Sequence, residues 1–205
     1  MEKKDVRIPQ QKRSIEKKEK IIEAAYSIFT ENGYFSTNTA QIAKKAGLST
    51  GSIYAYFSDK KDILLACLYK FGESLTEDIC DKMDSLSTSG DILNVIKKVL
   101  GIFVKLYGLK RPFHNEIISL QYMDEDVKNY FIHVEKSMMK AISGRIQESG
   151  YTFRHEREQT FLMFQMVKGI EDELAFDHSP DINQNILIDE CAHTIISMLI
   201  KNENK

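Results

Sequence analysis

The segment from Thr39 to Phe57, TAQIAKKAGLSTGSIYAYF, most constrains what this chain can fold into. Ile42 and Ala43 give its first half an apolar face. Gly47 stands where the chain must turn, because a left-handed backbone costs little only for glycine. Short hydroxyl side chains then open a second helix, where they can approach phosphates and base edges closely. The segment therefore predicts a helix–turn–helix unit whose second helix enters the major groove of DNA.

The charge of the chain is unevenly distributed. Residues 1–61 hold 12 Lys and Arg against 7 Asp and Glu, whereas the remainder holds 16 against 23. The first part, residues 1–61, is basic and the remainder is acidic, which favours a polyanionic partner for the first part alone. Short charge runs are also typical of ordinary solvated surfaces, so the asymmetry favours DNA only because it coincides with the helix–turn–helix segment.

The sequence around this segment resembles the N-terminal domain of TetR (tetracycline-repressor) family regulators over about residues 14 to 66. The motifs that carry the resemblance are Asn32-Gly33-Tyr34, Thr37, residues 42–49, residues 51–57 and Lys60-Lys61-Asp62-Ile63-Leu64. They follow one another in order without gaps, and the remaining two thirds of the chain shows no such match. The resemblance implies a homodimeric DNA-binding transcriptional regulator with a helical effector domain.

The resemblance also assigns residues to the DNA interface. By this resemblance, the front of the recognition helix is formed by Thr50, Gly51 and Ser52. The aromatic positions that contact phosphates or bases are Tyr54 and Tyr56, and the basic position at the start of the fourth helix is Lys60. From the residues themselves, Thr39 could bond a phosphate, Gln41 faces either the groove or solvent, and Lys44 adds a phosphate contact or a solvated charge. Residues 50–57 contain no Arg, Asn or Gln, the strongest bidentate base readers. We therefore expect specificity to depend on backbone geometry, thymine-methyl contacts and DNA shape.

The rest of the chain has helical periodicity and predicts an all-α protein of about nine helices, without a convincing strand. Residues 1–13 are expected to form a flexible basic arm, residues 14–60 the helix–turn–helix DNA-binding domain, and residues 61–205 a helical domain for effector binding and dimerisation. The expected helices are about residues 14–31, a short segment capped by Asn38 or Thr39, and residues 50–56, 59–85, 91–107, 113–121, 124–148, 154–176 and 181–202.

Two copies of the recognition helix, spaced one DNA turn apart (~34 Å), would read a palindromic operator. We therefore expect a homodimer. The last two helices have the wide apolar coverage of a four-helix interface between protomers, which is the arrangement that the resemblance implies. A place in the protomer's own core is the alternative for each residue. The expected interface residues are Phe161, Leu162, Val167, Ile195 and Leu199.

The resemblance further implies a small-molecule pocket between the helices of residues 61–205. Met and aromatic side chains can line an adaptable apolar pocket, and ordinary core packing is the alternative for each. The composition suits a lipophilic effector, such as a fatty acyl group or a lipophilic drug. DNA and effector would then disfavour each other reciprocally, as in a repressor released by its ligand. The expected lining residues are Phe103, Tyr107, Tyr122, Met123, Phe131, Met138, Phe161 and Phe164.

The sequence offers no catalytic motif. His155-Glu156 begins like the zinc-protease HExxH motif, but Gln159 occupies the second histidine position. There is no G-x-S-x-G, P-loop or G-x-G-x-x-G motif, so we expect no enzyme, no cofactor and no resident metal. A metal sensor stays open as an alternative, because the distant His114 and His178 could converge in space. A ligand-independent DNA-binding protein of the same fold and a transcriptional activator also stay open.

Composition also predicts where the protein works. Hydrophobic residues make up 42% and charged residues 28% of the chain, as in an ordinary soluble globular protein. No run approaches the roughly 18 apolar residues of a membrane span, and the charged N-terminus lacks an apolar signal core. Cys67, Cys80 and Cys191 are too widely separated for a CxxC pair or a disulfide framework. These features predict a cytoplasmic protein without a membrane partner.

Overall fold

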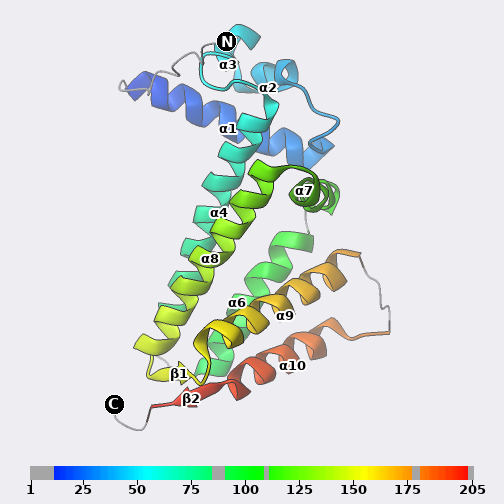
Figure 1. Ribbon diagram of the computed structural model, residues 1–205. Coiled ribbons are helices and arrows are strands. Elements are labelled where there is room, and N and C mark those ends of the chain that lie inside the picture. Colours follow the sequence, from blue (N-terminus) through cyan, green and yellow to red (C-terminus); the bar gives the residue numbers. More distant parts are fainter. Residues whose placement is uncertain (1–11, 85–90, 109–110, 177–180, 203–205) are drawn as a thin grey trace. The chain divides into compact units, whose positions relative to one another are not determined.

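The computed structural model describes residues 12–84, 91–108, 111–176 and 181–202 (Figure 1). Within these ranges it contains nine α-helices and one two-stranded sheet, which confirms the all-α fold class. None of the described helices is both long enough and apolar enough to span a membrane. The predicted basic arm, residues 1–13, lies outside the described residues except for its last two.

The chain folds into two compact units. One unit, here called the head unit, comprises Met1–Gly72 and Pro112–Tyr130. The other, here called the body unit, comprises Glu73–Arg111 and Phe131–Lys205. This grouping differs from the predicted division at residue 60, because a segment from the second half of the chain packs with the N-terminal helices.

The regular elements described in the head unit are all α-helices, joined by loops and turns. Its elements are α1 (Lys12–Asn32), α2 (Thr39–Ala46), α3 (Thr50–Ile53), the first part of α4 (Lys60–Asp84), most of α7 (Arg111–Met123) and the start of α8 (Glu125–Glu148). The apolar positions of α1 recur at helical spacing, and Ile21, Ala25 and Phe29 are fully buried. Helix α1 packs against α2 and ends at Asn32, and the next residue, Gly33, is left-handed with a φ of +86°.

Three contacts explain why residues 112–130 join the head unit. The Phe113 ring stacks on Phe29 of α1, with ring centroids 5.8 Å apart. The Lys61 ammonium of α4 pairs with Asp124 and Asp126 at 3.2 and 2.6 Å. In addition, the Tyr130 hydroxyl donates to the Leu68 carbonyl of α4. Helices α4 and α8 therefore each begin in the head unit and continue into the body unit.

Helix α3 is shorter than the predicted helix over residues 50–56. It ends at Ile53, and the chain continues as a turn through Tyr56. The N–H of Ala55 bonds the Ser52 carbonyl and the N–H of Tyr56 bonds the Ile53 carbonyl, so the last turn follows a tighter i+3 pattern. This tightening accompanies the burial of both Ile53 and Phe57 in the core.

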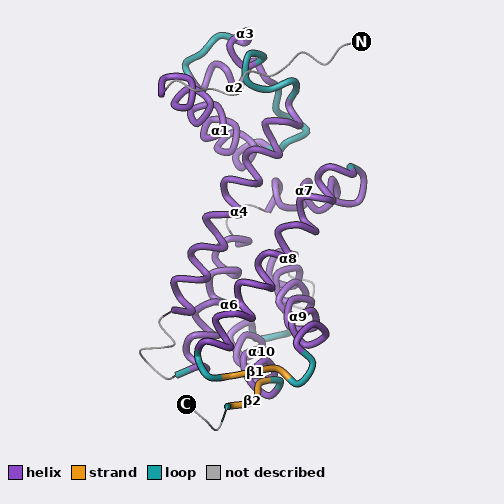
Figure 2. Tube along the Cα trace, turned by 60° about the vertical axis from the view of Figure 1, so that its left-hand side comes forward, coloured by secondary structure: helices purple, strands orange, loops and turns teal. Residues whose placement is uncertain are grey.

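In the body unit, α6 (Ile92–Gly108) packs against α9 (Glu156–Phe176) and α10 (Gln184–Ser197), and α9 also contacts α10 (Figures 1 and 2). The later parts of α4 and α8 complete the unit. Apolar residues from all five helices form one core, which includes Ile79, Val95, Ile142, Met163 and Ala192.

The prediction that the chain has no strand is wrong for two short segments. Strand β1 (Tyr151–Phe153) and strand β2 (Leu199–Lys201) lie side by side (Figure 2). They pair antiparallel, with Phe153 opposite Leu199. The helix predicted over residues 181–202 therefore begins at Gln184, after an Asn183 cap, and ends at Ser197. Strands of three residues are too short to show a period of two, so Tyr151–Phe153 lies outside every predicted element and Leu199–Lys201 lies within the helix predicted over residues 181–202.

Candidate functional site

A capping box fixes the start of α2. The Asn38 side chain accepts a hydrogen bond from the Gln41 N–H at 3.0 Å, and Gln41 Oε1 accepts one from the Asn38 N–H at 2.8 Å. The two residues thereby satisfy backbone donors that a helix start leaves unpaired. Gln41 was predicted to face the groove or solvent, and its side-chain oxygen is bound to the protein's own backbone. Its amide nitrogen remains as the group for an external contact.

The turn between α2 and α3 follows from Gly47 and Ser49. Gly47 is left-handed, with φ +69°, and the Leu48 N–H bonds the Ala43 carbonyl at 2.9 Å. Ser49 caps α3: its hydroxyl accepts from the Ser52 N–H at 3.2 Å and lies 2.8 Å from the Ser52 hydroxyl. Thr50, the first residue of α3, is exposed, so the front of this helix presents small polar groups to solvent.

Gly51 is exposed on the same turn of α3. A Cβ atom added at Gly51 would meet no atom of the protein nearer than Ser49 Oγ at 4.0 Å. Neither internal packing nor a left-handed backbone therefore requires glycine here. Close approach of an external molecule, such as a DNA backbone or base edge, is a reason for glycine at this position that the interior of the protein does not supply.

The two predicted tyrosines are held by hydroxyl groups. The Tyr54 hydroxyl lies 3.1 Å from Thr39 Oγ1, which joins the residue after α3 to the first residue of α2. The Tyr56 hydroxyl accepts a hydrogen bond from Ser14 of α1 at 3.2 Å. Thr39 and Tyr54, predicted separately, are thus brought together on one surface, where a phosphate oxygen could bind both hydroxyls.

The predicted lysines differ in their surroundings. Lys44 is exposed at the end of α2. Its neighbour Lys45 pairs with Glu31 of α1 at 2.7 Å and also donates to Ser27. The hydrogen bond from Lys45, followed by that from Ser27, lowers the pKa of Glu31. Lys44 is therefore the lysine of α2 that remains available to an external anion.

Lys60 contacts the loop between α1 and α2. Its ammonium donates to the carbonyl oxygens of Tyr34 and Thr37 at 2.8 and 2.7 Å and lies 4.2 Å from the centre of the Tyr34 ring. Burial lowers the pKa of Lys60, and the charge of Glu116 opposes this effect. The phosphate contact predicted for Lys60 would have to compete with these carbonyl groups.

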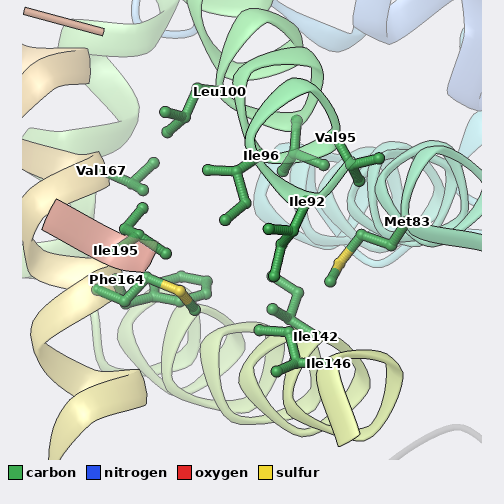
Figure 3. Close-up of a pocket in the computed structure, with 12 residues that line it drawn as sticks. Met83, Ile92, Val95, Ile96, Leu100, Ile142, Ile146, Phe164, Val167 and Ile195 are labelled. Carbon is green, nitrogen blue, oxygen red and sulfur yellow. The ribbon is translucent and has the colours of Figure 1, made fainter. Parts of the chain in front are cut away.

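The body unit contains a cavity whose lining side chains, among the described residues, are all apolar (Figure 3). Residues of α4, α6, α8, α9 and α10 converge on it. Its volume is about 40 Å³, which holds only two or three water-sized groups. The lining residues are Met83, Ile92, Val95, Ile96, Val99, Leu100, Ile142, Ile146, Met163, Phe164, Val167 and Ile195.

Of the residues predicted to line a pocket whose side chains the structure describes, Phe164 alone is among the residues around this cavity. Met138 is buried in the same core without lining the cavity. Tyr122 and Met123 are 84% and 79% exposed and belong to the head unit. The remaining predicted residues are Phe131, which is half-buried, Phe161, which is exposed, and Phe103 and Tyr107, whose side chains lie outside the described residues.

The predicted pocket lining consists of Met and aromatic residues and does not include the aliphatic residues of α6 that line the cavity. Ile92, Val95, Ile96, Val99 and Leu100 recur at steps of three and four residues, the spacing of one helix face. That spacing was visible in the sequence and could have identified the buried face of α6. It could not show that this face meets a cavity rather than close packing.

The predicted dimer residues fall into two groups. Phe161 and Leu162 are 53% and 51% exposed on α9. Val167 and Ile195 are buried and line the cavity, which is the core placement left open as the alternative. Leu199 is half-buried in β2 rather than in a helix. Of these predicted residues, only the first group has exposed side chains on α9.

The cysteines and histidines give no sign of metal or redox chemistry in the described parts of the chain. Burial raises the pKa of Cys67 to about 12 and that of Cys191 to about 11, which disfavours the reactive thiolate. Within the described ranges, no group of three or more His, Cys, Asp or Glu side chains is placed to hold a metal ion. His178, which the metal-sensor alternative pairs with His114, lies outside the described residues.

Comparison with known proteins relates the head unit to a bacterial family. Residues 21–67, which include α2, the turn and α3, match the family described as "Bacterial regulatory proteins, tetR family". The chain is 40% identical over 72 residues to the HTH-type transcriptional regulator HbdR of Aromatoleum sp. (strain CIB), a match that covers 35% of this chain and 31% of HbdR.

Two longer similarities extend into the body unit. The chain is 44% identical over 159 residues to the "Fatty acid metabolism regulator protein" of Bacillus subtilis (strain 168), which covers 69% of this chain and 76% of that protein. The structure of the fatty acid degradation regulator FadR from Bacillus halodurans superimposes with a TM-score of 0.65 at 20% identity, over 88% of this chain and 94% of that one. The second similarity concerns the fold alone.

Proposed function

Because the chain belongs to the TetR family, whose members are transcriptional regulators with an N-terminal DNA-binding domain and not enzymes, we propose that it is a homodimeric repressor released from a palindromic operator by a lipophilic effector. The observation that carries the choice of effector is the cavity of the body unit. The twelve described side chains that line it are aliphatic, aromatic or thioether groups without a hydrogen-bonding N–H or O–H.

An apolar lining selects the chemistry of the ligand. A polar ligand placed there would lose its hydrogen bonds to water without replacement, at a cost of about 1–3 kcal/mol for each unpaired group. A methylene chain loses nothing in this way and gains about 0.8 kcal/mol for each CH₂ that leaves water. The relative in B. subtilis is named a fatty acid metabolism regulator. We therefore propose the acyl chain of a fatty acyl compound as the part of the effector that enters the cavity.

The small volume of the cavity gives the effector a means to act. About 40 Å³ cannot hold a long acyl chain, so binding has to displace lining side chains. Met83 of α4 and Met163 of α9 are both in the lining, and unbranched thioether chains adapt readily. Helix α4 runs on from the head unit into the body unit, so a change in its later part is covalently connected to the head. An effector that favours the displaced arrangement would thereby disfavour DNA binding.

In the head unit, we propose that α3 enters the major groove and that Thr39 and Tyr54 bind one phosphate. Lys44, Thr50 and Gly51 are exposed beside or on these elements and supply the charge and the close approach. Two heads are needed for a palindromic operator. The exposed side chains of Phe161 and Leu162 on α9, and of Ile186 on α10, are the candidates for burial between protomers.

The test is binding of the protein to the DNA upstream of its own gene, compared with a shuffled duplex at fixed salt. We expect a clear preference for the upstream DNA and a fall in affinity of at least about tenfold when palmitate or its coenzyme A thioester is added. Equal binding to both duplexes would support a ligand-independent DNA-binding protein instead. Specific binding that neither compound changes would exclude the proposed effector class.

A matched pair of variants locates the effector. Ile96→Phe adds volume to the lining of the cavity, and we expect it to abolish the response to the acyl compound while operator affinity is kept. Ile132→Phe makes the same change at an exposed position of α8 in the body unit and is the control, with an unchanged response. An equal response in Ile96→Phe and the unmodified protein would place the effector elsewhere.

A further inference from the structure

The loop between α1 and α2, residues 33–38, is held on two sides by opposite charges. On one side, Lys60 of α4 binds the carbonyl oxygens of Tyr34 and Thr37. On the other side, Glu116 of α7 accepts hydrogen bonds from the backbone N–H groups of Tyr34 and Phe35, the second at 3.1 Å. One carboxylate oxygen, Oε2, receives both bonds.

This arrangement has the form of a backbone anion site. Two consecutive N–H groups that follow a left-handed residue converge on one anion, a geometry in which backbone amides bind negative charge. Gly33 is that left-handed residue, and a Cβ atom added to it would lie 2.5 Å from Glu116 Oε1. Glycine at this position therefore serves both the backbone conformation and the close approach of the carboxylate.

Helix α7 is fixed so that Glu116 meets the loop. Phe113, three residues earlier and hence on the same face of α7, stacks on Phe29 and meets Tyr26 edge-on at 6.3 Å. Phe29 in turn packs against Tyr34, with ring centroids 5.4 Å apart. The aromatic contacts and the carboxylate thus hold the same segment of the loop.

The loop carries the residues that start α2. Asn38, its last residue, is one half of the capping box, and Thr39 follows directly with its hydroxyl against Tyr54. We propose that Glu116 is a positioning residue for DNA binding: by holding the N–H groups of Tyr34 and Phe35, it sets the place of Asn38 and Thr39 relative to the rest of the head. The inference rests on the proposed operator binding. It adds a residue of α7, far from the helix–turn–helix in sequence, to the determinants of that binding.

The first measurement is independent of DNA. Hydrogen exchange of the Tyr34 and Phe35 amides, followed by NMR in the full-length protein, reports the two bonds directly. We expect exchange at these amides to accelerate about tenfold in Glu116→Ala and less in Glu116→Gln, which keeps one neutral acceptor. Glu125→Gln removes a charge from an exposed site in the first turn of α8 and should leave both amides unchanged. Unchanged exchange in Glu116→Ala would overturn the proposed contact.

The second measurement is operator affinity at fixed salt. We expect Glu116→Ala to bind the operator about tenfold more weakly, Glu116→Gln to be intermediate, and Glu125→Gln to match the unmodified protein. Wild-type affinity in Glu116→Ala, together with faster amide exchange, would overturn the positioning role and leave operator binding intact. If the unmodified protein shows no preference for the operator, the proposed function fails, and the exchange data still decide whether Glu116 holds the loop.

Discussion

The head unit and the body unit place their candidate functional residues by different kinds of interaction. In the head unit, directional hydrogen bonds hold them: the capping box of Asn38 and Gln41, the Ser49 cap, and the hydroxyl pair of Thr39 and Tyr54. In the body unit, apolar side chains surround the cavity by packing alone. Fixed donors suit a surface that must match phosphate positions, whereas side chains without directional bonds can repack around a ligand. We expect substitutions in the head unit and in the body unit to have correspondingly different effects.

The largest effect on stability is expected in the aromatic core of the head unit. Phe29 is fully buried and its ring packs against Tyr34 and Phe113. Phe29→Ala should lower the free energy of unfolding by about 3–5 kcal/mol, because the lost transfer energy is joined by the cost of a cavity. Urea unfolding followed by circular dichroism measures it.

Tyr122→Ala is the control for Phe29→Ala. Tyr122 also belongs to the head unit and is an aromatic residue, but its side chain is 84% exposed. Its truncation should change the free energy of unfolding by less than about 0.5 kcal/mol. Equal losses in the two variants would contradict the burial on which the head unit is built.

The sequence predicted much of the head unit because its signals are local. The turn glycine Gly47, the α2 cap at Asn38 and the small polar start of α3 all lie within one short segment, and each acts on its immediate neighbours. The role of Lys60 could not be predicted in this way. Its carbonyl partners, Tyr34 and Thr37, are 26 and 23 positions away, and only the folded loop brings them to its ammonium.

The cavity could not be predicted because it, too, is formed by residues that are distant in the sequence and meet only in the folded protein. Its lining runs from Met83 to Ile195 and is assembled from five helices. Helical periodicity identifies the buried face of each helix, yet it does not show where those faces leave a space between them. Residue type was a poor guide, because aromatic residues such as Tyr122 and Phe161 are exposed while isoleucines and valines line the cavity.

Helix caps allow the two units to be compared by one substitution. Asn38 caps α2 in the head unit, and Asn183 caps α10 in the body unit by accepting from the N–H groups of Asn185 and Ile186. Replacement of either by Ala should lower the free energy of unfolding by about 1 kcal/mol. Operator affinity should fall in Asn38→Ala alone, because only that cap places Thr39. A loss of operator affinity in Asn183→Ala of the same size would show that the two units do not respond separately.

Two glycines test whether DNA approaches the head closely. A Cβ atom at Gly144 of α8 meets nothing within 4 Å, and one at Gly51 of α3 meets only Ser49 Oγ at 4.0 Å. Ala at either position should leave stability unchanged or raise it by up to about 1 kcal/mol, through helix propensity. Operator affinity should fall in Gly51→Ala and stay constant in Gly144→Ala, as measured by fluorescence anisotropy at fixed salt. Unchanged affinity in Gly51→Ala would mean that DNA does not contact this turn.

The smallest expected effect concerns the ion pair of Glu31 and Lys45 between α1 and α2. The hydrogen bond from Lys45 lowers the pKa of Glu31 in the folded protein, so the pair stabilises the fold above the unfolded pKa of about 4.3. This contribution disappears as the pH falls through the lower, folded pKa. Both side chains are exposed, so the effect should be slight and should weaken in high salt. Thermal unfolding of the unmodified protein and of Glu31→Gln, compared from pH 7 down to about pH 3, should show a small difference that closes on acidification. A difference that persists at low pH would have to come from the packing of the side chain rather than from its charge.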